Sequence, residues 1–159
     1  MVYKWFDHLK AEGHYLNAYV VMPNHLHLLI SFRNKGKTIN SIISNGKRFM
    51  AYKIVKRLKN AGHEDVLLRL ANAVTRSDKA RGKNHQVFEP SFDCKECFSR
   101  KFILQKLNYI HNNPCSGKWR LTDSPEKYLH SSALYYKTGE HGSYSVVDYS
   151  VMQDIDLTK

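Results

Sequence analysis

Two histidines placed two residues apart in a strand-like segment are the first residues in this sequence whose types and spacing allow chemistry. Residues 23–30 read PNHLHLLI. Residues two apart in a β-strand point to one face, so His25 and His27 project together, about 7 Å apart at Cα for a rise of about 3.4 Å per residue. Two imidazoles at that spacing can bind one cation. A bare pair is equally a polar strand face, because two ligands do not make a metal site. The opposite face would be buried through Leu26, Leu28 and Ile30.

A helical segment farther along the chain supplies a phenol and an amide. Residues 99–112 have a helical pattern that ends before Pro114, with a core stripe of Ile103, Leu107 and Ile110. Tyr109 lies off that stripe, and Asn113 follows four residues later, where side chains are about 5–6 Å apart at Cβ. Both therefore face one place, although Pro114 is expected to turn Asn113 away from helical geometry. Taken alone, Tyr109 is also typical of a half-buried packing residue.

The elements that must position these residues follow from periodicity and turn signals. A helix from Val2 with a stop at Gly13 precedes two strands joined by the turn at Pro23-Asn24, which predicts a hairpin. Thr38 is a suitable cap for a long helix. After it we expect a shorter helix at residues 66–74, a mobile loop at 75–84 and an edge strand at 86–93. The helix of Tyr109 spans residues 99–112, a last helix spans 124–137, and a weakly ordered tail follows at 139–159.

The charge of the chain indicates a polyanionic partner. It has 25 Lys and Arg against 14 Asp and Glu, a net charge of +11, which favours nucleic-acid binding. The long helix has an apolar stripe at Ile39, Ile42, Ile43, Phe49, Met50 and Ile54, with Gly46 on the same side, and a basic outer face. The residues expected to bind DNA are Lys47, Arg48, Lys53, Lys56 and Arg57. Lys47 and Arg48 are the leading candidates.

Length and composition place the chain among ordinary globular domains. With 159 residues, 42% hydrophobic and 25% charged, it is long enough for one domain. The longest uncharged apolar stretch, residues 15–30, contains polar residues and does not predict a membrane span. The absence of a leader-like start predicts a cytoplasmic protein. Three cysteines, Cys94, Cys97 and Cys115, fit reduced thiols.

Three strings together resemble a known family. MPNHLHLLI at residues 22–30 and LNYIHNNP at residues 107–114 closely resemble the HUH single-tyrosine transposases, nearest the insertion-sequence-200-like group that includes the REP-associated tyrosine transposases. The stretch YLHSSA at residues 128–133 is similar to the C-terminal helix of that family. The resemblance covers residues from about Tyr15 to Tyr136.

This resemblance implies a fold and an activity. The fold is an α+β, ferredoxin-like antiparallel sheet with helices on one face, here residues 1–138 followed by a tail at 139–159. The activity is metal-dependent cleavage and rejoining of single-stranded, hairpin-flanked DNA through a 5′-phosphotyrosine. His25 and His27 match the metal pair, Asn113 the third ligand and Tyr109 the nucleophile. The expected ion is Mg²⁺ or Mn²⁺, and no nucleotide cofactor or membrane partner is expected.

The chain departs from the family pattern at its start. Members usually begin with a further strand upstream of the first helix, and here that strand is expected to be missing. Unpaired strand edges are costly, so either another chain completes the sheet or the sequence is trimmed. We therefore expect a homodimer in which the sheets or exchanged segments cover each other. Such a dimer could bring Tyr109 of one chain to the histidines of the other, so both a single-chain and a shared active site stay open. The DNA substrate places the protein at the nucleoid.

Other interpretations stay open at this stage. The pair Cys94-x-x-Cys97 could form a zinc site with His85, His111 or Cys115, although the spacing matches no common module. Glu89 or Asp93 could act near the metal from the edge strand. The chain could be a decayed or domesticated relative that only binds structured nucleic acid. A metal-dependent hydrolase of small phosphoesters would make Tyr109 dispensable.

Overall fold

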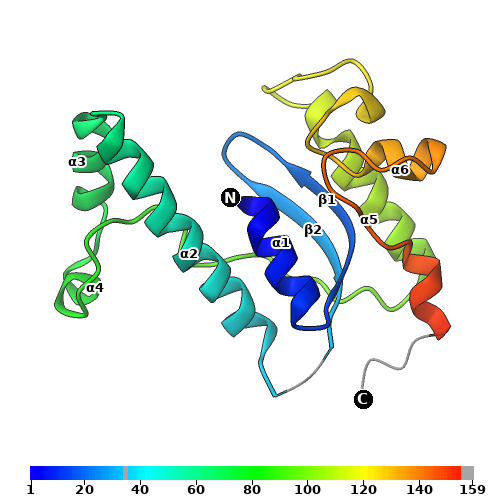
Figure 1. Cartoon of the computed structure of the whole chain (residues 1–159), viewed down its shortest axis with the longest axis horizontal. Helices are drawn as coiled ribbons and strands as arrows, with labels where there is room; N and C mark the ends of the chain where they lie inside the picture. The colour runs from blue at the N-terminus through cyan, green and yellow to red at the C-terminus, as the bar shows by residue number, and fades with distance from the viewer. Residues whose placement is uncertain (34–35, 155–159) are drawn as a thin grey trace. The chain divides into compact units, whose positions relative to one another are not determined.

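The computed structural model describes residues 1–33 and 36–154 and has the expected α+β class (Figure 1). Its one sheet is an antiparallel pair of strands. The helices and strands are α1 (Val2–Ala11), β1 (Tyr15–Val21), β2 (Leu26–Ser31), α2 (Ile39–Asn60), α3 (Glu64–Asn72), α4 (Arg76–Ala80), α5 (Arg100–Asn112) and α6 (Ala133–Thr138). Three short 3₁₀ helices are Asn113–Cys115, Pro125–Lys127 and Tyr149–Asp154. No helix in the described ranges is long and apolar enough to cross a membrane.

Contacts divide the chain into two compact units. The helical unit consists of Met1–Val2 and Lys37–Lys95, and the hairpin unit consists of Tyr3–Gly36 and Glu96–Lys159. The resemblance had grouped residues 1–138 as one domain. Each unit has its own buried residues, so each is described separately.

The hairpin unit is built on the predicted pair of strands. β1 is buried from Leu16 to Val20 and pairs with β2 in a register that sets Tyr19 opposite Leu28 and Val20 opposite His27. The turn closes through the Met22 amide, which donates to the His25 carbonyl at 2.8 Å. These observations confirm the hairpin.

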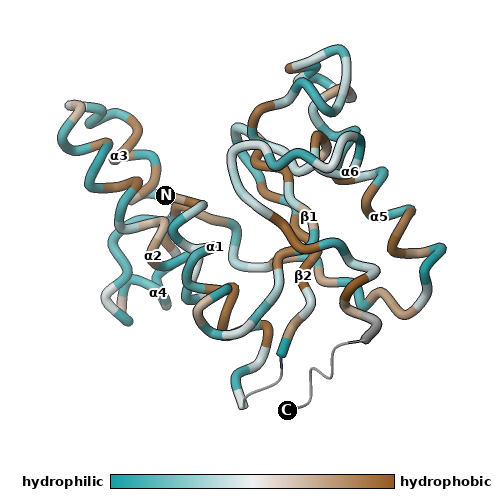
Figure 2. Tube along the Cα trace, turned by 45° about the vertical axis from the view of Figure 1, so that its right-hand side comes forward, coloured by the Kyte–Doolittle hydropathy of each residue, from teal (hydrophilic) through white to brown (hydrophobic). Residues whose placement is uncertain are grey.

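Helices cover both faces of this hairpin. On one face Ala18, Val20 and Met22 pack with Leu107 and Ile110 of α5. The opposite face presents Tyr19, whose ring lies 5.4 Å from the ring of Phe6 in α1. The prediction of helices on one face is therefore wrong for α1 and α5. The physical reason is that β1 is apolar on both sides, so both sides need cover. The tube of α5 alternates between hydrophobic and hydrophilic residues, as expected of a helix with one buried face (Figure 2).

The outer edge of β1 is paired with the C-terminal part of the same chain. The Val21 amide donates to the His130 carbonyl at 2.9 Å, and the Ser132 amide donates to the Tyr19 carbonyl at 3.0 Å. Farther along the edge, the Val147 amide donates to the Leu16 carbonyl at 2.9 Å. β1 thus has hydrogen-bonding partners along both edges, which removes the open flank on which the dimer prediction depended at this strand.

This pairing corrects two predictions about the C-terminal part. Residues 124–137 were expected to form one helix, but only Pro125–Lys127 and Ala133–Thr138 are helical, because residues 130–132 run along β1 instead. The tail was expected to be weakly ordered. Within residues 140–154, however, Val146 is buried and the Tyr144 ring stacks on Tyr3 with centroids 5.6 Å apart.

The helical unit is organised around α2. Thr38 caps the helix as predicted, since its side chain accepts from the Ser41 amide, and Ile42, Gly46 and Met50 are buried. Phe49 was placed on this buried stripe, but it is 55% exposed, because the stripe follows the i, i+4 positions and leaves Phe49 on the adjoining face.

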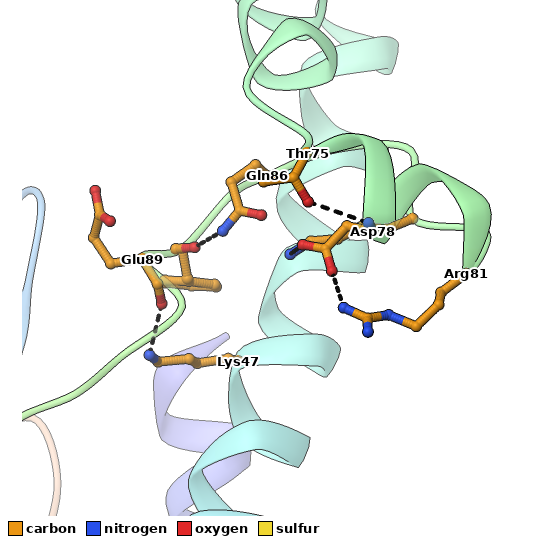
Figure 3. A network of polar contacts seen from close by, with 8 residues as sticks. Lys47, Thr75, Asp78, Arg81, Gln86 and Glu89 are labelled. Atoms are coloured by element: carbon orange, nitrogen blue, oxygen red, sulfur yellow. Dashed lines mark hydrogen bonds and ion pairs between the residues drawn. The ribbon is translucent and has the colours of Figure 1, made fainter.

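The segment after α3 differs from its prediction. Residues 75–84 contain α4, capped by Thr75, rather than a mobile loop. Residues 86–93 do not form the predicted edge strand. They are held by the Lys47 ammonium, which donates to the Glu89 carbonyl at 2.9 Å (Figure 3). The same ammonium donates to the Ser91 carbonyl at 2.8 Å. The Lys47 side chain therefore donates the hydrogen bonds that a neighbouring strand would have supplied to these carbonyls.

Candidate functional site

The two histidines of the hairpin lie side by side. His25 ends the turn and His27 belongs to β2, and their ring centroids are 4.9 Å apart. They share the face of the hairpin that α5 covers, because His27 pairs with Val20, a residue of the α5 core. Strand alternation had predicted this common orientation.

Helix α5 brings the phenol and the amide to the same two rings. The Tyr109 ring lies 5.1 Å from the His27 ring, in an edge-on arrangement. Asn113 Oδ1 lies 3.0 Å from His25 Nε2. Asn113 keeps helical φ and ψ of −54° and −43°, so the expected turn away from helical geometry before Pro114 does not occur. All four predicted residues converge in the hairpin unit.

Packing of α5 fixes this arrangement. The helix begins at Ser99, whose side chain accepts from the Phe102 amide. Leu107 and Ile110 are buried against β1, which turns the intervening Tyr109 toward the rim of the interface. Tyr109 is 55% exposed, so its hydroxyl is accessible to a large substrate. The sequence alone had placed it off the core stripe for the same reason.

Both ring nitrogens of His25 face amide oxygens. Nδ1 lies 2.8 Å from Asn24 Oδ1, and Nε2 faces Asn113 Oδ1. A neutral imidazole donates from one nitrogen and accepts at the other, and the side-chain amides of Asn24 and Asn113 orient the ring from both sides. When Nδ1–H donates to Asn24, the Nε2 lone pair and the Asn113 oxygen are left facing each other. This is the donor arrangement of a metal site whose histidine is oriented by an outer partner.

The spacing of the donors fits a small divalent ion. Adjacent ligands about 2.1 Å from an octahedral ion are about 3.0 Å apart, and His25 Nε2 and Asn113 Oδ1 have that separation. Two imidazoles and one amide are borderline-hard ligands that suit Mn²⁺ and, more weakly, Mg²⁺. His25, His27 and Asn113 would hold the ion, and the remaining positions would be open to phosphate oxygens and water.

The electrostatics of the site favour an uncharged His27. Burial lowers the pKa of His27, and the nearby His25 and Lys106 lower it further. A neutral imidazole is the form that binds metal. Lys106 precedes Tyr109 by one helical turn and brings a positive charge to the site, with its ammonium 4.9 Å from the Phe102 ring centroid.

Asn24 and Lys106 are functional candidates that the sequence reasoning missed. Asn24 was assigned to the turn only, and Lys106 was not singled out. The i, i+3 spacing of Lys106 and Tyr109 on one helix was a usable signal. The contact of Asn24 with its neighbour His25 depends on the turn geometry, which the sequence does not specify.

The residues expected to bind DNA all lie on α2, in the helical unit. Arg48, Lys53, Lys56 and Arg57 are exposed. Lys47 is different, because its ammonium holds the backbone of residues 89–91 and burial lowers its pKa, an effect that Glu89 opposes. It is the weakest of the five as a phosphate contact.

The three cysteines, Cys94, Cys97 and Cys115, form no disulfide with one another. Among residues 1–33 and 36–154, no three His, Cys, Asp or Glu side chains are grouped so that they could hold a metal. Asp93 forms an ion pair with Lys95 at 3.3 Å. The grouping of His25, His27 and Asn113 differs from these in that its third member is an amide.

Comparison with known proteins gives no match: no family model, no curated protein and no solved structure matches this chain. The site therefore has to be interpreted from its own geometry, together with the resemblance of its motifs.

Proposed function

We propose that this chain is a metal-dependent endonuclease and strand transferase of the HUH single-tyrosine transposase type, acting on single-stranded DNA next to a hairpin. One observation carries the proposal. Tyr109 and Asn113, which are 82 and 88 residues from His27 and His25 in the sequence, meet the rings of His27 and His25 respectively. A phenol beside two imidazoles and an amide has the parts for phosphoryl transfer to tyrosine.

The reaction assigns a role to each residue. Tyr109 Oη attacks the scissile phosphorus, a bond forms between Oη and phosphorus, and the bond from phosphorus to the 3′-oxygen breaks. The phenolic proton passes to solvent, which reaches the half-exposed ring, and the leaving 3′-oxygen takes up a proton. A divalent ion held by His25, His27 and Asn113 would withdraw charge from the phosphate and orient it. Lys106 adds positive potential.

The phosphotyrosine retains the energy of the phosphodiester bond. The 3′-hydroxyl of a second strand can therefore attack the phosphorus, release Tyr109 and rejoin the DNA without ATP. An active site completed within one chain is the simplest form, since Tyr109 lies beside His27 of the same chain.

The covalent adduct is the direct test. The protein is incubated with Mn²⁺ and an oligonucleotide that carries a hairpin and a single-stranded flank, and the mass of the product is measured. The wild type and Tyr52→Phe, which alters a tyrosine that is more exposed than Tyr109, are expected to form the adduct, and Tyr109→Phe is not. An adduct on any other tyrosine would refute the assignment. DNA binding with no adduct under any condition would favour the non-catalytic relative.

We also propose a homodimer at a cytoplasmic location. In the described residues β1 is paired on both edges, whereas β2 has β1 as its only strand partner. Pairing of two β2 edges would close the sheet symmetrically. Light scattering over a concentration series measures this directly, and a monomer at every concentration would exclude the dimer without affecting the single-chain active site.

A further inference from the structure

Helix α2 is unusually one-sided in charge. Its 22 residues include six Lys or Arg and no Asp or Glu. Within the described residues, Arg48, Lys53, Lys56, Arg57 and Lys59 take part in no ion pair and no hydrogen bond from their side chains. Five cations without an ion pair leave a strong field for an external polyanion.

Two large aromatic side chains are exposed among these cations. Phe49 is 55% exposed and Tyr52 is 68% exposed. They are three residues apart, so their Cβ atoms lie about 5–6 Å from each other on one side of the helix. The guanidinium of Arg48 lies 5.8 Å from the Phe49 ring centroid.

Cations and rings share a single face. Arg48, Tyr52 and Lys56 follow one another at intervals of four, and Lys59 continues the face three residues later. The buried stripe of α2 lies elsewhere, at Ile42, Gly46 and Met50. The two rings are therefore not part of the core of the helical unit.

From this we propose that the α2 face formed by Arg48, Phe49, Tyr52, Lys56 and Lys59 binds single-stranded nucleic acid, with bases stacked on Phe49 and Tyr52 and phosphates paired with the cations. Base stacking on exposed rings along a basic track is how single strands are bound without sequence preference. A duplex does not offer its base faces, and an apolar protein partner would gain little from two rings enclosed by charges. From Arg48 to Lys59 the face is about 17 Å long, which equals about five nucleotides at about 3.4 Å each.

This surface lies in the helical unit and does not use Tyr109. It adds a strand-holding surface to the proposed function, and it would exist in a protein that binds without cutting. Binding at α2 and cleavage at Tyr109 can therefore fail separately.

The test compares strands with and without bases. Full-length protein in EDTA is titrated into fluorescein-labelled 12-mers of thymidine, of uridine and of abasic sugar-phosphate, and into a duplex of equal length. The wild type is expected to bind the thymidine or uridine strand more tightly than the abasic strand and the duplex. Phe49→Leu and Tyr52→Leu should each weaken binding to the base-bearing strand by about fivefold to a hundredfold, with no loss on the abasic strand.

Matched variants separate stacking from charge and from folding. Phe98→Leu removes another ring, 88% exposed and in the hairpin unit, and should not change affinity. Tyr52→Phe keeps the stacking ring and should bind as the wild type does. Lys56→Gln should lower the log–log salt slope by about 0.7, whereas the two leucine variants should leave the slope unchanged.

The outcomes decide between occupants. If the leucine variants lose affinity only for the thymidine strand, the face binds DNA, and if they lose affinity only for the uridine strand, it binds RNA. If they lose affinity for both strands, the face binds either polymer. Equal affinity for the abasic and base-bearing strands, or no loss in the leucine variants, overturns the proposal. So does a change in sedimentation of the leucine variants without a change in strand binding, which would make the rings a protein interface. Ring-dependent binding without any Tyr109 adduct would leave this inference standing and reject the proposed cleavage.

Discussion

Acidification should destabilise the hairpin unit through one buried histidine, His111. Its side chain is 8% exposed, and Nε2 lies 2.9 Å from Ser132 Oγ. The Ser132 hydroxyl is positioned to donate to the Tyr19 carbonyl, so a neutral His111 donates from Nε2. Within the described residues Nδ1 has no hydrogen-bond partner, and protonation there would place a charge without a protein partner in a site largely removed from solvent.

The magnitude follows from the change in pKa. Burial lowers the pKa of His111 from 6.5 to about 4. Each pH unit corresponds to about 1.4 kcal/mol, so the full change corresponds to about 3 kcal/mol. Because the folded-state pKa is the lower one, the unfolded chain binds more protons between pH 6.5 and 4. The contribution of neutral His111 to the free energy of unfolding is therefore fully present above pH 6.5 and is lost as the pH falls toward 4.

The assay uses the two tryptophans, both in the hairpin unit. Urea unfolding is followed by the fluorescence of Trp5 and Trp119 from pH 7 to pH 4, in EDTA so that metal binding does not contribute. The free energy of unfolding should fall by about 3 kcal/mol more in the wild type than in His111→Gln, which cannot titrate. The exposed His8→Gln variant should follow the wild type. Parallel curves for the wild type and His111→Gln would refute the reasoning.

Three further predictions concern single contacts. Asn24→Ala removes the oxygen that orients His25, so Mn²⁺ affinity measured by calorimetry should fall by about tenfold to a hundredfold, whereas Asn45→Ala on α2 should have no effect. Ser132→Ala should lower the free energy of unfolding by about 1–3 kcal/mol in urea, because the Tyr19 amide and His111 both lose their partner. Arg48→Gln should lower the salt slope of strand binding by about 0.7, while Lys47→Gln, whose ammonium is already engaged, should leave it unchanged.

Part of the site geometry was predictable from sequence, because each of its two pairs of residues lies within a single short segment of the chain. His25 and His27 share a face by strand alternation, and Tyr109 and Asn113 share a side of one helix by the i, i+4 rule. Neither rule says that the helix lies over the strand. That step came from the joint resemblance of the two motifs to one family, and in the structure it depends on the packing of Leu107 and Ile110 against β1.

The contacts that sequence reasoning missed join distant residues. Lys47 binds carbonyls 42 and 44 residues away, and the partner of the Tyr19 amide is 113 residues away. Residues 128–133 resembled a helix, yet hydrogen bonds to the backbone of β1 hold residues 130–132 beside that strand. The periodicity of apolar residues indicates which face of a segment is buried. It does not identify which other segment of the chain packs there or forms hydrogen bonds with it.

Closure of β1 by its own chain has a consequence for the proposed chemistry. In-line transfer requires the attacking oxygen and the phosphate to be held with sub-ångström precision, and a two-stranded hairpin alone is too weakly stable to do so. Here Ser132 pairs with Tyr19 on the edge of β1, and its hydroxyl contacts His111 of α5. The same residue therefore ties the strand beside the histidines to the helix that carries Tyr109. The position of Tyr109 relative to His25, His27 and Asn113 is thus set within one chain, by a buried contact whose hydrogen bonding depends on a neutral His111.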